Sequence, residues 1–231
     1  MSLGYKTSAT VQPTDVLARM SEPDRMEMLA HGDVHHYAKG EFVFRAGGPG
    51  KHVYFLRHGR IKVCQPSPAG KEVILWFCFS GEIFGLAEVA QGGGRVVHAQ
   101  ACEPSEVVRL SQSQFFEFLR THPDSAQLIM QVLSCRMRNL SEVIVNLVND
   151  DVETRITKLI LRLGARYGVP VGQDIHLNIT LTHQEIADMV GTTRQTVTGI
   201  LSKLKRQGFM SLENRRIQIE SPELSESSRH A

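Results

Sequence analysis

The pattern of apolar and polar positions changes twice along the chain. Between residues 33 and 110, short apolar or alternating runs end at glycines roughly every ten residues, as in HVYFLRHGRIKVCQ. Strands of this length and spacing are typical of an antiparallel sandwich or barrel. We expect strands within 41–50, 52–65, 71–79, 82–86, 95–102 and 105–110, with a turn at 67–72.

A helical period precedes these runs. Within residues 15–31, Ser21 stands where a helix N-cap is expected. The apolar positions at roughly helical spacing are Leu17, Met20, Met26 and Leu29. After the strands, a short helix is predicted over 111–120, capped by Ser111 or Ser113.

The clearest helical period starts at Pro123, a residue suited to a first helical turn. Apolar residues then recur at alternating steps of four and three. They are Ala126, Met130, Leu133, Met137, Leu140, Ile144 and Leu147. This period of about 3.5 residues favours pairing with a second copy of the helix, and hence a homodimer, over packing against the chain's own barrel.

The region after Asn149–Asp151, which we interpret as a hinge, begins with another predicted helix. This helix covers 152–168, stops at Gly164 or Gly168, and precedes a short strand at 175–179. Its apolar positions are Ile156, Leu159, Ile160 and Leu163.

Two further helices separated by a glycine follow this strand. Thr182 and Glu185 form a capping box at the start of the first helix, and Gly191 ends it after about two turns. A second helix begins at Thr192–Thr193, and Gly208 closes it. The residues expected to face the core are Ile186, Val190, Val197, Ile200, Leu201 and Leu204. This is the layout of a helix-turn-helix, whose second helix can enter a DNA major groove.

The outward residues of the second helix have the chemistry of base and phosphate contacts. Arginine reads guanine through two hydrogen bonds, glutamine can pair with adenine, and threonine hydroxyls bond phosphates or bases. A two-stranded wing, Met210–Leu212 with Arg216–Ile219, adds basic residues. The candidate DNA-binding residues are Thr182, Thr192, Thr193, Arg194, Gln195, Thr196, Thr198, Lys205, Arg215 and Arg216. A helical hairpin used only for packing would not need this polar first turn and basic wing.

The total charge hides this basic region. The chain of 231 residues has 26 Lys and Arg against 24 Asp and Glu, a formal net charge of +2. Residues 194–216, however, hold six basic residues and one acidic residue. Such a local excess suits a polyanion even when the whole chain is nearly neutral.

Composition excludes several classes of protein. A 42% hydrophobic and 22% charged chain is not collagen-like, disordered or a disulfide scaffold. No run approaches the ~18 apolar residues of a membrane span, and the N-terminus lacks an apolar signal core. The four cysteines form no CxxC pair and suit free thiols, so we expect a cytoplasmic protein without membrane contact.

Taken together, these patterns predict an α+β chain. It would have flexible tails at 1–14 and 221–231, a β-barrel domain at 15–120, a dimerisation helix and hinge at 121–150, and a winged helix-turn-helix DNA-binding domain at 151–220.

Over nearly its whole length the chain resembles the cyclic AMP receptor protein/FNR (CRP/FNR) family of bacterial transcription regulators. The resemblance rests on VYFLRHGRIKV…GKEVIL…GEIFG, on the helix and hinge from Pro123 to Asp151, and on QEIADMVGTTRQTVTGIL. It implies a cyclic-nucleotide-binding-like jelly roll, a dimer formed through 126–147, and Arg194 and Gln195 as the leading base readers.

The resemblance also implies that the β-barrel at 15–120 is an effector-sensing domain with a ligand pocket. In the family, backbone amides and an arginine hold the cyclic phosphate, and a glutamate takes a ribose hydroxyl. Arg95 is in place here, but Leu86 stands at the glutamate and Val96 at the hydroxyl that follows the arginine. Leu140 stands where the cyclic AMP receptor protein has an adenine-contacting threonine. The candidate pocket residues are Gly81, Glu82, Phe84, Gly85, Leu86, Arg95, Val96, Leu140 and Ser141.

The loss of these polar contacts disfavours cyclic AMP as the signal. Glu88 could replace the missing ribose ligand only if the loop were shifted by two residues. An unidentified apolar or anionic small ligand between the barrel and the dimer helix is the favoured effector.

Other signals known in the family leave different traces. No iron–sulfur cluster is expected, because no cysteine precedes Cys64. Haem would need an axial ligand, for which Cys78 and His98, or the histidines before the barrel, are candidates, and thiol sensing could use Cys102 or Cys135. No metal site is expected at the histidines before the barrel, His31, His35 and His36, because no carboxylate or cysteine completes the set.

The sequence therefore predicts a homodimeric, sequence-specific DNA-binding transcription regulator gated by a signal sensed in the barrel. Its expected partners are double-stranded DNA with a palindromic site, RNA polymerase and a small-molecule effector. No nucleophile–base motif, phosphate-binding loop or paired carboxylates indicates an enzyme. The alternatives are a haem- or thiol-based gas or redox sensor of the same family, and a cyclic-nucleotide-binding module that does not use DNA.

Overall fold

The computed structural model separates the chain into two compact units. It describes residues 15–67, 71–172, 174–213 and 216–219. The N-terminal unit runs to Ser141 and the C-terminal unit starts at Glu142, within one continuous helix. The predicted segment 121–150 is therefore divided between the two units. The predicted tails 1–14 and 221–231 lie outside the described residues.

The N-terminal unit is built mainly from strands. In chain order its elements are α1 (Val16–Arg19), α2 (Glu22–Ala30), β1 (Asp33–Tyr37), β2 (Phe42–Phe44), β3 (His52–His58), β4 (Arg60–Pro66), β5 (Glu72–Phe79), β6 (Ile83–Phe84), α3 (Leu86–Gln91), β7 (His98–Ala101), β8 (Ser105–Ser111) and α4 (Gln112–Thr121). The long helix α5 (Pro123–Asn149) follows and crosses the boundary between the units.

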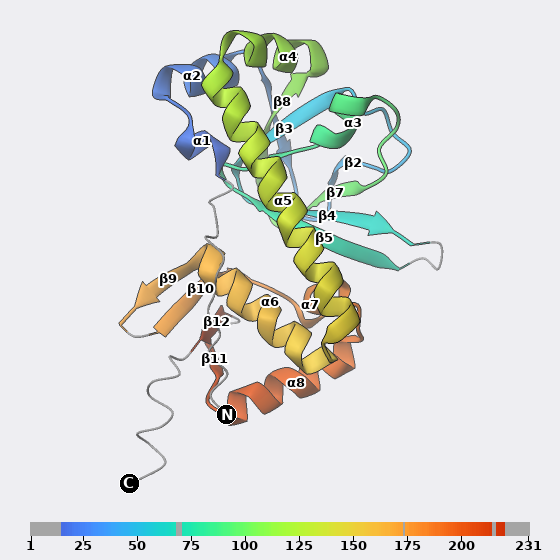
Figure 1. Cartoon of the computed structure of the whole chain (residues 1–231), viewed down its shortest axis with the longest axis vertical. Coiled ribbons are helices and arrows are strands. Elements are labelled where there is room, and N and C mark those ends of the chain that lie inside the picture. Colours follow the sequence, from blue (N-terminus) through green and yellow to red (C-terminus); the bar gives the residue numbers. More distant parts are fainter. Residues whose placement is uncertain (1–14, 68–70, 173, 214–215, 220–231) are drawn as a thin grey trace. The chain divides into compact units, whose positions relative to one another are not determined.

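These strands form two antiparallel four-stranded sheets, in the orders β1-β8-β3-β6 and β2-β7-β4-β5 (Figure 1). One buried cluster joins the sheets face to face, with Tyr54 and Leu56 from β3 and Ile61 and Val63 from β4. The predicted jelly roll is confirmed, as two separate facing sheets rather than a closed barrel.

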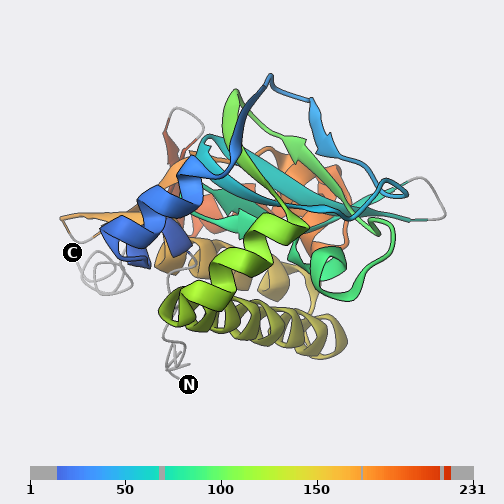
Figure 2. The ribbon, with the colours of Figure 1, turned by 90° about the horizontal axis from the view of Figure 1, so that it is seen from above.

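Strand β3 is buried on both faces. Val53 and Phe55 pack into a second cluster with the helices, whereas the residues that alternate with them face the sandwich interior. This explains why the run predicting the strand is continuously apolar. The helices that cover this face lie together on one side of the sheets (Figure 2).

The predicted N-terminal helix is two helices, because Met20 adopts an extended backbone conformation and Ser21 caps α2. The expected apolar stripe is partly wrong. Met26 is 64% exposed, whereas Met28 is fully buried in the helix-facing cluster.

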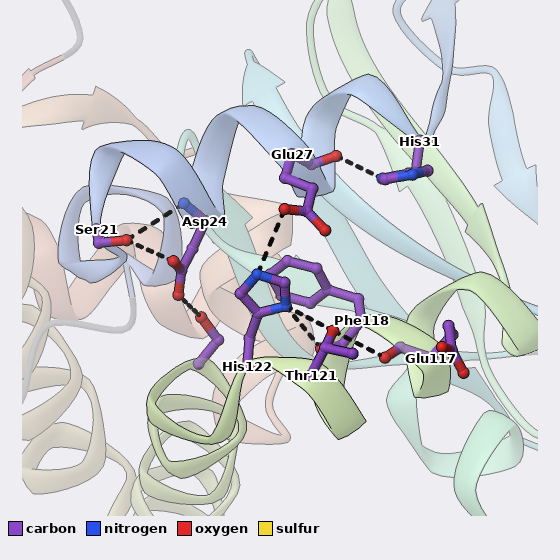
Figure 3. A network of polar contacts seen from close by, with 9 residues as sticks. Ser21, Asp24, Glu27, His31, Glu117, Phe118, Thr121 and His122 are labelled. Atoms are coloured by element: carbon purple, nitrogen blue, oxygen red, sulfur yellow. Dashed lines mark hydrogen bonds and ion pairs between the residues drawn. The ribbon is translucent and has the colours of Figure 1, made fainter.

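A network of polar contacts joins α2 to the α4–α5 junction (Figure 3). Ser125, a buried residue of α5, donates a 2.8 Å hydrogen bond to Asp24. The Ser21 hydroxyl donates to the other oxygen of that carboxylate at 2.6 Å. His122 stacks on Phe118 with centroids 4.2 Å apart, and Nε2 of His122 lies 3.5 Å from Oε2 of Glu27. The start of α5 is therefore fixed to the N-terminal unit by side-chain contacts.

The C-terminal unit combines three helices with one sheet. Its elements after α5 are α6 (Val152–Tyr167), β9 (Gly168–Val171), β10 (Asp174–Thr180), α7 (His183–Val190), α8 (Arg194–Arg206), β11 (Met210–Glu213) and β12 (Arg216–Ile219), with the sheet order β11-β12-β10-β9. Asp151 caps α6 by accepting a hydrogen bond from the Thr154 amide. The predicted apolar face of α6 is buried in the core of this unit. Among the described residues, no helix is long and apolar enough to span a membrane.

Candidate nucleic-acid interface and sensor site

Helix α7 begins and ends as the sequence predicts. The Thr182 hydroxyl accepts a hydrogen bond from the Glu185 amide at 3.1 Å, and the Glu185 carboxylate accepts one from the Thr182 amide at 2.7 Å. Gly191 has a φ of +71°, a left-handed conformation that favours glycine. The chain therefore turns sharply at Gly191 before it enters α8.

Helix α8 has a buried face and a polar first turn. Val197, Leu201 and Leu204 are buried against α7 and the sheet, whereas Ile200 is only half-buried. Thr193 caps the helix by accepting a hydrogen bond from the Thr196 amide at 3.2 Å. The exposed candidate residues at or near these two helix starts are Thr182, Thr193, Arg194, Gln195, Thr196 and Thr198, and Thr192 is half-buried.

His183 is a residue of this surface that our sequence reasoning missed. Its Nδ1 lies 2.8 Å from the hydroxyl of Thr198, which itself donates to the Arg194 carbonyl at 2.9 Å. Because the hydroxyl has one proton, it must accept from Nδ1 of His183. The imidazole therefore joins the first turn of α7 to the exposed face of α8. The only signal in the sequence was its place next to the cap, in LTHQE.

Basic residues continue along α8 into the wing. Lys205 and Arg206 are exposed, whereas Nζ of Lys203 lies 2.7 Å from a carboxylate oxygen of Glu153 on α6. Strands β11 and β12 pair antiparallel and form the predicted wing. Arg216 begins β12, and Arg215 lies outside the described residues.

The candidate effector residues of the N-terminal unit centre on Arg95. This side chain is fully buried, and its guanidinium donates to the Gly85 carbonyl at 2.9 Å and to the His52 carbonyl. It lies over the Phe44 ring, 4.3 Å from the centroid. Gly85 has a φ of +77° and begins α3, where we had expected a strand.

Glu88, on α3, is the main partner of this arginine. One carboxylate oxygen accepts from Arg95 Nη1 at 2.7 Å, and the other accepts from the Val96 amide at 3.3 Å. The sequence predicted a strand within 82–86 and no helix after it. The ion pair between Glu88 and Arg95 was therefore not predicted.

The other predicted pocket residues are dispersed. Gly81 bonds to α1 through its carbonyl, Glu82 is buried, and Phe84 stacks on Tyr54 with centroids 5.2 Å apart. Leu86 is buried in the apolar cluster shared with the helices, and the Val96 side chain is exposed.

The two pocket candidates on α5 do not offer a ready polar contact. Leu140 is exposed, and the Ser141 hydroxyl donates to the Met137 carbonyl of its own helix at 3.0 Å.

The apolar seam of α5 is largely exposed. Met137 and Ile144 are 66% and 62% exposed. Most other seam residues are also exposed, namely Met130, Leu133, Leu140 and Leu147, and Ala126 is half-buried. The residues of α5 that are buried are Ser125, Ile129, Val132 and Cys135. Within the N-terminal unit, the helix residues buried against the rest of the unit are therefore not those of the stripe.

The cysteines and histidines considered for haem, thiol or metal sensing have other environments. None of the four cysteines forms a disulfide, and burial raises the pKa of Cys64 to about 11. Cys78 and Cys135 are buried, and Cys102 is half-buried. His98 accepts a hydrogen bond from the Ala46 amide through Nδ1 at 3.0 Å. Within the described ranges, no group of three or more His, Cys, Asp or Glu is placed to hold a metal ion.

Comparisons with known proteins agree with this architecture. A cyclic nucleotide-binding domain model matches residues 34–122, and a Crp-like helix-turn-helix domain model matches residues 154–224. A global nitrogen regulator of Synechocystis is 30% identical over 188 residues, covering 80% of this chain and 84% of that protein. The cAMP-activated global transcriptional regulator CRP of Pasteurella multocida is 30% identical over 199 residues, covering 86% and 95%. These relatives are transcription regulators rather than enzymes.

Solved structures show the same fold. A CooA mutant from Carboxydothermus hydrogenoformans superposes with a TM-score of 0.76 at 22% identity, covering 94% of this chain and 95% of that one. The c-di-GMP responsive regulator CLP of Xanthomonas campestris superposes with a TM-score of 0.72 at 22% identity, covering 87% and 100%.

Proposed function

The chain belongs to the CRP/FNR family of DNA-binding transcription regulators, and from this premise we propose that it binds a two-fold symmetric DNA site as a homodimer gated through its N-terminal unit. RNA polymerase is a further proposed binding partner, and a small-molecule effector is the proposed signal.

The exposed first turn of α8 is the observation that carries this proposal. Arg194 and Gln195 follow the cap at Thr193 directly, and both side chains are exposed. The amino-terminal end of a helix carries a partial positive charge, which favours the approach of a phosphate backbone. In the proposed complex, Arg194 and Gln195 read base edges, while the threonines and Lys205 contact phosphates.

The exposed seam of α5 supports the proposed dimer. Seven positions spaced by alternating four and three residues suit a parallel or antiparallel pair of helices, and exposed apolar stripes of this kind are unusual on a monomer. A symmetric pair would present two copies of α8. Half-sites about one helical turn apart, ~34 Å, are what such dimers bind.

The continuity of α5 supports the proposed gating. Arg136 donates to the Ile83 carbonyl of β6 and lies 5.3 Å from the Trp76 ring centroid, which ties the helix to the sheets. At the other end, Nζ of Lys158 on α6 lies 2.7 Å from a carboxylate oxygen of Asp150 and 3.1 Å from the side-chain oxygen of Asn146. A ligand that changed how Arg136 is held would act on the same helix that leads into α6.

Arg194→Ala tests this function. With a duplex selected by the full-length protein, the substitution should cost ~1–3 kcal/mol of specific binding measured by fluorescence anisotropy. The matched control is Arg120→Ala, an exposed arginine of α4 that pairs with Glu117 on its own helix. The control should bind as the unmodified protein does. Unchanged affinity of the Arg194→Ala protein would refute its role as a base reader.

A further inference from the structure

A buried arginine–carboxylate ion pair, Arg95 with Glu88, lies where the family resemblance places the phosphate of an effector. The Arg95 side chain is 0% exposed and that of Glu88 is 8% exposed. The family resemblance assigned Arg95 to a phosphate, and Glu88 was considered only as a substitute ribose ligand in a shifted loop.

We propose that Glu88 is a built-in anion that occupies the phosphate position of the sensor unit and excludes phosphate-bearing ligands. A carboxylate that accepts from an arginine and from the next backbone amide makes the contacts that a bound phosphate oxygen would require. The chain thus supplies from α3 the negative charge that an effector would otherwise bring.

The surroundings of Glu88 hold it in this position. A Cβ atom added at Gly50 would lie 2.4 Å from the Cβ of Glu88, so the backbone of the neighbouring loop packs directly on this side chain. A Cβ added at Gly85 would lie 3.2 Å from Nη1 of Arg95 and 2.9 Å from the Tyr54 ring. Because Gly50 and Gly85 have no side chains, Glu88 and Arg95 can approach each other closely enough to form their ion pair.

Displacement of Glu88 by a ligand would be costly. The incoming anion would leave a carboxylate buried without its cation, and an unpaired buried charge is strongly unfavourable. An internal partner also needs no loss of translational freedom to bind, whereas a free ligand does. The residues present therefore do not fit a cyclic nucleotide held through Arg95.

This inference deepens the proposed function by naming a ligand class that the sensor unit rejects, and it rests on the proposal that this unit receives the signal. Its test measures ligand binding without DNA. A negative result would therefore overturn the role of Glu88 and leave DNA recognition by α8 untouched.

Cyclic AMP and, in a separate series, inorganic phosphate are titrated into the full-length protein by calorimetry. Thermal unfolding midpoints are recorded with each ligand at constant ionic strength. The variants are Glu88→Gln, which keeps the shape of the side chain, and Glu88→Ala, which vacates the position. The matched control is Glu106→Gln, which removes the partner of Arg57 in a more exposed pair at 2.8 Å. A double variant, Glu88→Ala with Arg95→Met, removes both buried charges.

We expect no saturable binding by the unmodified protein, the Glu106→Gln control or the double variant. At least one Glu88 variant should bind saturably, at least ~10-fold more tightly than the weakest affinity the calorimetry detects, with an unfolding midpoint raised by the ligand. Binding of cyclic AMP alone by a Glu88 variant would identify a nucleotide-binding site. Binding of both anions would identify a general phosphate-binding site. The proposal is overturned if the unmodified protein binds cyclic AMP as tightly as Glu88→Gln does, or if folded Glu88 variants gain nothing. If the Glu88→Ala protein unfolds because Arg95 has lost its partner, the Glu88→Gln protein still provides the test.

Discussion

Asp24 shows how one side chain can hold two helices together. Its carboxylate accepts hydrogen bonds from Ser21 on its own helix and from Ser125 on α5 (Figure 3). These two bonds, the Ser21 bond first, lower the pKa of Asp24 below its ordinary value of 3.8. The charged form is therefore the one that the folded state prefers.

This lowered pKa predicts a dependence of stability on pH. Because the folded pKa lies below the unfolded value, the contribution of Asp24 is present above about pH 4 and is lost as pH falls through the folded pKa. We expect the urea midpoint of the unmodified protein to fall more steeply between about pH 5 and pH 2 than that of Asp24→Asn.

The matched control is Asp124→Asn, an exposed carboxylate in the first turn of α5. Its acid profile should follow that of the unmodified protein. Parallel profiles for Asp24→Asn and the unmodified protein would show that the hydrogen bonds to Asp24 do not stabilise the folded state.

Single residues also mark where sequence reasoning stopped. Thr182, Ser111 and Ser21 were predictable as caps because capping depends on neighbours within four residues. The pairing of Glu88 with Arg95 was not, because it depends on the left-handed turn at Gly85 that begins α3.

At the scale of elements, long periodic segments were the most predictable. The extents of α5, α6 and the helix-turn-helix follow from apolar spacing and from capping residues that can be recognised in the local sequence. Strand β1 was not among the predicted runs because DVHHY has little apolar content, and β9 was missed because Pro170 interrupts a short run. Both strands form by pairing with distant partners, β8 and β10, which local patterns do not specify.

The apolar seam of α5 is the element that we expect to hold the dimer together. Met137→Asp places a charge in the middle of the proposed helix pair, where it would be buried without a partner. We expect the dimer to dissociate at least ~10-fold more readily, measured by sedimentation equilibrium.

Arg138→Asp is the control for this change, since Arg138 is exposed on the same turn but lies off the seam. That variant should keep the affinity of the unmodified dimer. Equal weakening by both substitutions would show that charge near the helix, and not the seam, controls association, and an unweakened Met137→Asp dimer would remove the coiled-coil proposal.

At the scale of the whole molecule, charge placement matters more than the total. A net charge of +2 conceals an exposed basic edge on α8, which bears Arg194, Lys205 and Arg206. The antiparallel strand domain and the helix-turn-helix followed from local sequence patterns, whereas the family and its jelly roll followed from the resemblance. The division between the two units inside α5 did not follow, because a continuous helix gives no local signal of which core its turns join.

The central claim is that a symmetric dimer reads DNA through two copies of α8. Its most direct test is selection of bound duplexes from a fully random library by the full-length protein, followed by sequencing. The account predicts enrichment of two-fold symmetric sites with half-site centres about 10 base pairs apart, and loss of that enrichment with Arg194→Ala. Enrichment of no sequence, or only of asymmetric sites, would contradict it.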